Sequence, residues 1–202
     1  KLEVRNLSFG YKKQKILKDV SFTASLGEVN CFIGKNACGK TTLGKTINAH
    51  FKHINYLSLG DFCRKNIAHN TPIGVKIKHY IDHSVRYDAA FLYDLVNHIL
   101  DESGSDELLF DGLPRFVDEI MILKRILSKY ETGWCIDLRA DKKICTQRCL
   151  KRNRQVDMQD LAFRLESYKN QYNDIIKELI RLDFDIIQLN ANQNIETVTS
   201  DC

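Results

Sequence analysis

The feature that most constrains this chain is the stretch GKNACGKT at residues 34–41, which matches the pattern G-x-x-x-x-G-K-[ST] without deviation. It follows the short apolar run EVNCFI (28–33), which favours a strand, and it precedes helical apolar spacing over 40–50. Glycines at these places let the backbone wrap an anion, so that N–H groups and the helix N-terminus face its charge. The fold must therefore place a phosphate-binding turn between a strand and a helix.

The side chains of this loop indicate which anion it serves. Lys40 would neutralise the β- and γ-phosphates of a nucleoside triphosphate, and the Thr41 hydroxyl would hold Mg²⁺. A glycine turn that arose by chance is the alternative, and the strand and helix on either side argue against it. We therefore expect a nucleoside triphosphate and Mg²⁺ to bind here, through Gly34, Asn36, Ala37, Cys38, Gly39, Lys40, Thr41 and Thr42.

Strand and helix signals alternate along the rest of the chain. This alternation predicts an α/β fold with a parallel sheet covered on both faces, here a P-loop NTPase three-layer sandwich. We expect one domain over residues 1–202, with an additional N-terminal β-hairpin over 1–27. The expected strands are 2–9, 16–24, 28–33, 53–58, 108–111, 134–138 and 185–189, and the expected helices are 40–50, one from near 60, 73–84, 89–100, 116–129, 141–152 and about 157–181.

Charge and cysteine usage narrow the classes of function. The net charge of +4 suits an anionic small ligand and is too weak to indicate nucleic-acid binding by itself. No apolar run approaches membrane-spanning length, and no basic-then-apolar leader opens the chain. The seven cysteines are an odd number without CxxC spacing, which favours reduced thiols over zinc or disulfides. We expect a cytoplasmic monomer that binds neither nucleic acid nor membrane.

Residues 2–43 resemble the opening of an ATP-binding cassette (ABC) transporter ATPase. That resemblance implies that an aromatic residue of the first hairpin, here Tyr11, stacks on the adenine of ATP. A surface turn aromatic without a ligand is the alternative for Tyr11. The chain lacks an LSGGQ-type signature, and Gly112 follows Asp111 where a Walker B glutamate would stand. The ABC resemblance therefore covers only about the first fifth of the chain and does not set its function.

From residue 28 to about 198 the chain resembles adenylate kinase and the other nucleoside monophosphate kinases. The segments that carry the resemblance occur in the family's order, and they are GKNACGKTT, LSLGDFCR (57–64), LFDGLPR (109–115), TQRCLKRNR (146–154) and FRLESY (163–168). The resemblance implies transfer of the γ-phosphoryl group of ATP to a nucleoside monophosphate. Such transfer needs positioning and cationic neutralisation rather than a nucleophile, which agrees with the many arginines in these segments.

The resemblance also implies a role for each charged residue in the motifs. Arg64 and Arg115 would clamp the acceptor phosphate, and Asp111 would organise the waters of Mg²⁺. Arg148 would cover the ATP base, while Arg152, Arg154 and Arg164 would close over the transferring group together with Lys40. The family pattern further implies an acceptor-binding segment over 58–90, a short lid over 152–157 and a cis Leu113–Pro114 bond.

Two positions in the acceptor motifs depart from the adenylate kinase pattern. Leu59 stands where those enzymes usually carry a hydroxyl beside Asp61, and Glu119 stands where they carry a base-reading glutamine. An ionised carboxylate only accepts hydrogen bonds, so it mispairs with adenine N1 and suits the N1–H and N2–H₂ donors of guanine. We therefore expect AMP not to be the strongly preferred acceptor. A P-loop kinase of another small acceptor and a non-catalytic nucleotide-binding module are the alternatives.

Overall fold

A computed structural model of the chain describes residues 2–11, 14–24, 28–50, 54–83, 85–102, 107–126, 131–152 and 161–192. Its centre is a five-stranded sheet in the order β4-β5-β3-β6-β7, and every neighbouring pair of strands is parallel. The strands are β3 (Glu28–Gly34), β4 (Asn55–Ser58), β5 (Leu108–Asp111), β6 (Glu131–Arg139) and β7 (Asp185–Asn190). The α/β class and the parallel sheet that the sequence predicts are therefore confirmed.

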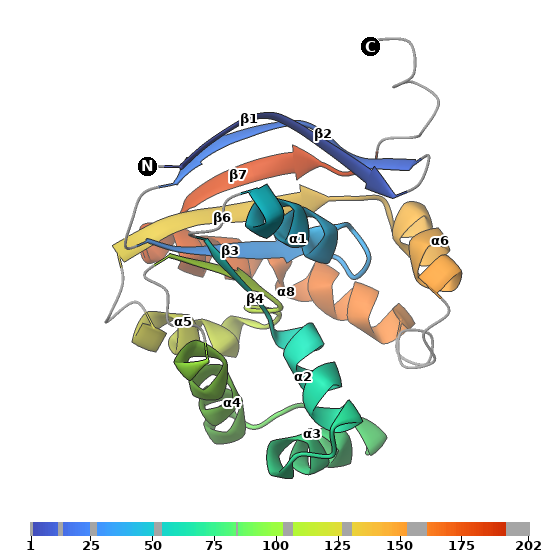
Figure 1. The fold of residues 1–202 in the computed structure, drawn as a ribbon, viewed down its shortest axis with the longest axis vertical. Helices are drawn as coiled ribbons and strands as arrows, with labels where there is room; N and C mark the ends of the chain where they lie inside the picture. Colours follow the sequence, from blue (N-terminus) through green and yellow to red (C-terminus); the bar gives the residue numbers. More distant parts are fainter. Residues whose placement is uncertain are drawn as a thin grey trace.

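Helices cover both faces of this sheet, because the strand side chains alternate between two apolar layers (Figure 1). In β3, Val29, Cys31 and Ile33 belong to one layer and Phe32 to the other. The helices that contribute to the Phe32 layer are α1 (Lys40–His50), α6 (Lys142–Arg152) and the first turns of α8 (Leu161–Arg181). The opposite layer receives α4 (Ala89–Asp101), α5 (Ile120–Ile126) and the later turns of α8.

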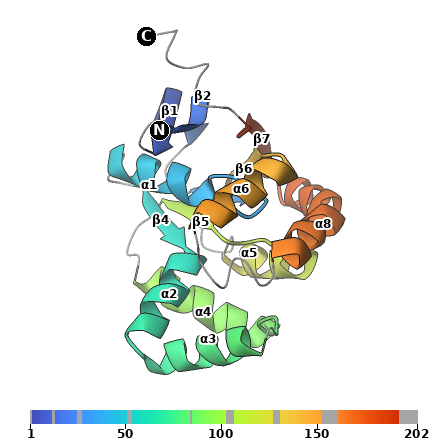
Figure 2. The same ribbon diagram turned by 90° about the vertical axis from the view of Figure 1, so that its right-hand side faces the viewer.

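Three helices between β4 and β5 form an arm that extends away from the sheet (Figures 1 and 2). They are α2 (Leu59–Ala68), α3 (Pro72–Asp82) and α4, and together they contain most of the expected acceptor-binding segment 58–90. A side-chain cap begins each one: Ser58 accepts from the Asp61 N–H, Thr71 from that of Gly74 and Asp88 from that of Phe91. Local sequence therefore fixes where each helix of the arm starts.

The expected helix over 116–129 is divided in the structure. A short 3₁₀ turn, η1 (Val117–Glu119), precedes α5, and residues 127–129 lie outside the described part of the chain. The turn forms because the Glu119 carboxylate accepts the backbone N–H groups of Arg115 and Phe116, which holds the chain in a tighter bend than an α-helix. The cis Leu113–Pro114 bond just before it is present as expected.

The N-terminal hairpin is a separate two-stranded antiparallel sheet, as the sequence predicts. Its strands β1 (Leu2–Tyr11) and β2 (Gln14–Ala24) pair with several register shifts. The hairpin lies beside β7, at the end of the molecule opposite the helical arm (Figures 1 and 2). Among the described helices, none combines the length and the apolar character needed to span a membrane.

Candidate active site

A cleft of about 330 Å³ opens at the carboxyl ends of β3 and β5, between the phosphate loop, the helical arm and α8. Parallel α/β sheets bind ligands at this edge, because the loops after the strands converge there. The predicted site residues that line the cleft are Gly34, Asn36, Ala37, Gly39, Lys40, Thr41, Arg64, Asp111, Arg115, Glu119 and Arg164. Segments that are far apart in the sequence therefore meet in one cavity.

Other predicted site residues do not line the cleft. Cys38, Thr42, Leu59, Asp61 and Arg148 lie next to it or beneath it. Arg148 links the phosphate loop to the residue after β7, since it donates to the carbonyl of Cys38 at 3.2 Å and to that of Ala191 at 3.0 Å. The side chains of Tyr11 and Arg152, the residue Arg154 and most of the expected lid 152–157 lie outside the described part of the structure.

Backbone conformation shapes the phosphate loop. Gly34 and Gly39 have φ angles of +139° and +120°, which residues with a side chain rarely adopt. A Cβ at Gly34 would also lie 2.7 Å from the Leu138 carbonyl oxygen, so a larger residue would push the loop off β6. Lys40 Nζ lies within the loop and donates to the carbonyls of Gly34 at 2.6 Å and Lys35 at 3.1 Å. The sequence motif therefore corresponds to a preformed concave loop with an ammonium group inside it.

Thr41 and Asp111 form the group that fits a magnesium ion. The Thr41 hydroxyl donates to Asp111 Oδ2 at 2.8 Å, and Asp111 is buried at the end of β5. Because the hydroxyl proton is directed at Asp111, the hydroxyl lone pairs stay available for a cation, and both groups supply the hard oxygens that Mg²⁺ prefers. No cluster of three or more metal-ligating side chains occurs among the described residues.

Tyr56 is a member of this group that sequence reasoning missed. Its hydroxyl donates to the same Asp111 Oδ2 at 2.7 Å, and burial followed by the charge of Asp111 raises the pKa of Tyr56 well above its ordinary value. Its ring packs on α1 at Gly44. The sequence gives no signal for this contact, because Tyr56 stands on β4 outside every recognised motif.

Charged side chains from α2 and from the turn after β5 form the acceptor side of the cleft. Arg64 and Arg115 both line it, as the resemblance implies. Asp61 does not face the cleft, since it pairs with Arg64 and with Lys45 of α1, the latter at 2.8 Å. Burial would raise the pKa of Asp61, but these two partners outweigh burial and hold that pKa below its ordinary value. Asp61 thus links the phosphate-loop helix to the arm.

Leu59 lies in the apolar core and not in the cleft. Its side chain is 2% exposed and packs close to Gly112, where an added Cβ would lie 3.0 Å from the Leu59 Cβ. The expected place of Leu59 beside the acceptor base therefore differs from its place in the structure. An apolar side chain is stable there because the neighbouring positions belong to the same buried layer.

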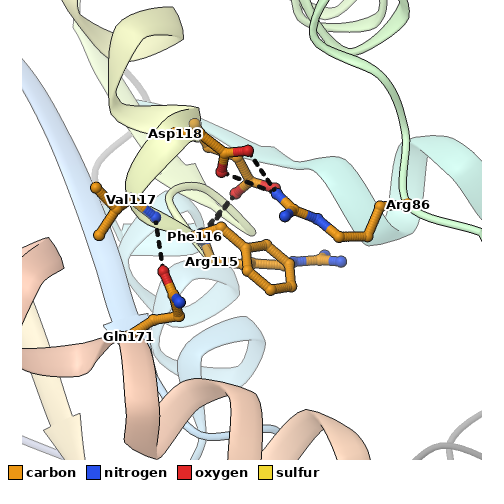
Figure 3. Close-up of polar contacts among 7 residues, drawn as sticks. Arg86, Arg115, Phe116, Val117, Asp118 and Gln171 are labelled. Carbon is orange, nitrogen blue, oxygen red and sulfur yellow. Dashed lines mark hydrogen bonds and ion pairs between the residues drawn. The ribbon is translucent and has the colours of Figure 1, made fainter.

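Glu119 is buried at the base of the acceptor side, and its two oxygens have different surroundings. Oε2 accepts the backbone N–H groups of Arg115 at 2.6 Å and Phe116 at 3.3 Å, whereas Oε1 lies 3.8 Å from Arg86 Nη2. Burial raises the pKa of Glu119, and these N–H groups and the two arginines oppose the rise. Figure 3 shows the Arg86 side chain extending toward this turn from the segment between α3 and α4. Only Oε1 thus remains for a ligand.

A buried carboxylate holds the first half of α8, which carries Arg164 into the cleft. Asp137 on β6 is fully buried and accepts the hydroxyl of Tyr172 at 2.7 Å and that of Tyr168 at 3.3 Å. Arg139 donates to the same carboxylate at 2.9 Å. Arg164, Tyr168 and Tyr172 follow one another at intervals of four residues, so they share one face of the helix. Asp137 therefore sets the orientation of the face that bears Arg164.

Comparison with known proteins places the chain in a family. The family model described as adenylate kinase matches residues 32–181. "Adenylate kinase 1" of Nostoc sp. is 28% identical over 172 residues, which cover 83% of this chain and 92% of that protein. "Adenylate kinase" of Trichodesmium erythraeum is 28% identical over 84% of this chain and 92% of its own length. "Adenylate kinase" of Corynebacterium glutamicum strain R is 30% identical over 71% and 81%.

The family match begins within β3 and ends at the last residue of α8, so it contains every residue that lines the cleft. The hairpin β1–β2 lies before it. Because the motifs, the sheet order and the family model agree over most of the chain, this protein belongs to the adenylate kinase family and is an ATP-dependent nucleoside monophosphate kinase.

Proposed function

We propose that the cleft holds ATP on the side of the phosphate loop and a nucleoside monophosphate on the side of Arg64 and Arg115. The observation that carries this proposal is the placement of cationic groups around one cavity: Lys40 from the loop, Arg64 and Arg115 from the acceptor side, and Arg164 from α8. Two phosphate groups repel each other as they approach, and cations on all sides lower that cost. A module that only senses one nucleotide has no use for clamps on a second phosphate.

On the donor side, the loop N–H groups and Lys40 would hold the β- and γ-phosphates of ATP. Thr41 and Asp111 would hold Mg²⁺, which would supply further charge neutralisation on the phosphate oxygens when it is bound. Tyr56 would keep the Asp111 carboxylate in place through its 2.7 Å hydrogen bond. Arg148 would cover the ATP base, and Arg152, Arg154 and Arg164 would close over the transferring group and exclude water.

On the acceptor side, Arg64 and Arg115 would bind the phosphate of the nucleoside monophosphate, and Glu119 would face its base. With Oε2 already accepting two backbone N–H groups, an ionised Glu119 offers the base an acceptor at Oε1. Guanine can donate N1–H or N2–H₂ to that oxygen, whereas adenine N1 would meet lone pairs. We infer that AMP is not strongly preferred and that a guanine nucleotide or a non-standard acceptor is used better.

A comparison of kcat/KM for AMP, GMP, CMP and UMP with ATP and Mg²⁺ tests this assignment. The mispaired adenine should lose about 1–3 kcal/mol, which reverses a preference without excluding AMP. An AMP lead of tenfold or more would show that Glu119 does not read the base in this way. Turnover of none of the four would favour a different small acceptor. A cytoplasmic monomer remains our expectation for the protein.

A further inference from the structure

Arg86 is a cleft residue to which neither the sequence motifs nor the family resemblance gives a role. It lies between α3 and α4 of the helical arm, and it lines the cleft beside Tyr87 and Phe116. Its side chain is 46% exposed, so a ligand can reach it. A long cationic side chain at the edge of a cavity is often a solvated surface group. The contacts of Arg86 decide whether its guanidinium group is instead held in place to bind a ligand.

Three contacts fix the guanidinium group of Arg86. Its Cζ lies 3.5 Å from the centre of the Phe116 ring, and Nη2 donates to both Asp118 oxygens at 2.9 and 3.1 Å. Nη2 also lies 3.8 Å from Glu119 Oε1 (Figure 3). An arginine that only screens charge at a surface has no need of an aromatic platform and a carboxylate partner. These contacts hold a planar donor group in one orientation beside the oxygen that Glu119 leaves available.

The remaining donors of Arg86 are what a base would meet. A guanidinium group carries five N–H donors, and the hydrogen bonds of Arg86 to described residues all leave from Nη2. Because the two oxygens of the Asp118 carboxylate lie close together, one Nη2–H can serve both, and the second Nη2–H with the parallel N–H of a neighbouring nitrogen forms a pair of donors for a base. Asp118 cannot serve the base in the same way, because both of its oxygens accept from Arg86 and it lines no part of the cleft. The acceptor-base pocket thus presents a fixed donor group next to a fixed acceptor oxygen.

We propose that Arg86 is a specificity-determining residue for the acceptor base, and that with Glu119 it selects guanine; this inference rests on the proposed function. Guanine carries two acceptors side by side, O6 and N7, which two N–H groups of one arginine can bind together. Its N1–H lies next to O6 and can donate to Glu119 Oε1. Adenine presents N6–H₂ where guanine presents O6, so the same arginine would face a donor. Uracil offers O4 and N3–H but nothing in place of N7.

Two acceptors that differ by one atom test this contact. We would measure kcat/KM for GMP, 7-deaza-GMP and AMP with the unchanged protein, Arg86→Ala and Arg86→Lys. In the unchanged protein, loss of N7 should lower kcat/KM about tenfold. In Arg86→Ala that penalty should vanish, and the GMP:AMP ratio should fall at least tenfold. Arg86→Lys keeps the charge without the planar pair of donors and should resemble Arg86→Ala in its response to 7-deaza-GMP.

Arg181→Ala is the matched control, since Arg181 is an exposed arginine that pairs with Glu178 and lines no part of the cleft. Its acceptor ratios should equal those of the unchanged protein. If Arg86→Ala slows all acceptors equally, Arg86 only positions the arm, and the inference is wrong. If Arg86→Ala fails to fold, the 7-deaza-GMP penalty in the unchanged protein still decides, because its absence overturns the inference. Failure of the proposed function would look different: the unchanged protein would phosphorylate no nucleoside monophosphate.

Discussion

The phosphate loop of the donor half is shaped by its backbone, whereas the acceptor half of the cleft is made of side chains. Residues 34–41 shape the donor half through positive φ angles and a helix N-terminus, and Lys40 is the main charged group that they add. The acceptor half collects Arg64, Arg86, Arg115 and Glu119 from three separate segments. A site made of backbone has one geometry for every phosphate ligand. A site made of side chains can change its ligand through one substitution, so specificity should reside there.

The largest expected effect lies in the donor half. Lys40→Ala should lower kcat by at least about 10³-fold, because it removes the ammonium group inside the loop and leaves the developing charge on the β- and γ-phosphates uncompensated. Steady-state rates with saturating ATP measure this loss. Lys78→Ala, which removes an exposed lysine paired with Asp82 on the arm, should leave the rate unchanged. Substantial turnover by Lys40→Ala would show that this loop is not the donor site.

Arg115→Ala should impair the acceptor half of the cleft and leave the donor half intact. Removing a charge-assisted contact to a desolvated phosphate costs about 2–5 kcal/mol, and here that cost should fall on acceptor KM and on kcat. ATP affinity, measured by titration without acceptor, should change little. If Arg115→Ala weakened ATP binding as much as acceptor binding, Arg115 would belong to the donor half, and the two halves could not be distinguished in this way.

A smaller effect is expected from Tyr56→Phe, which keeps the ring on Gly44 and removes only the hydroxyl that donates to Asp111. A hydrogen bond to a charged group contributes about 1.5–3 kcal/mol, so kcat should fall roughly 10- to 100-fold and the Mg²⁺ concentration for half-maximal rate should rise. Tyr93→Phe, on α4 and outside the cleft, is the control. An unchanged Mg²⁺ dependence would mean that Tyr56 has only a packing role.

The difference between a loop shaped by its own backbone and a pocket assembled from distant side chains also explains which features the sequence could predict. The element order, the parallel sheet and the place of the phosphate loop follow from local patterns, namely apolar runs, helix caps and a glycine spacing. The structure agrees with all three, although η1 interrupts the start of the helix expected over 116–129. The charged residues of the acceptor motifs could be named because those motifs occur in the family's order.

Contacts between distant segments could not be predicted. Tyr56 meets Asp111 across 55 residues of sequence, and Arg86 meets Asp118 across 32. The family pattern puts Leu59 where a hydroxyl meets the acceptor base, yet the first turn of α2 directs its side chain into the core. Neither a spacing nor a composition rule encodes such pairs, since they depend on how β4, β5 and the arm pack together.

The contact between Gly44 and Tyr56 limits the order in which this active site can change. An added Cβ at Gly44 would lie 2.0 Å from Tyr56 Cε2, a distance that no two carbon atoms tolerate without bonding. Gly44→Ala on its own therefore forces the tyrosine ring away from Asp111. If position 56 first receives a smaller side chain, the same alanine becomes acceptable. The two positions are therefore epistatic: the steric cost of Gly44→Ala depends on which side chain occupies position 56.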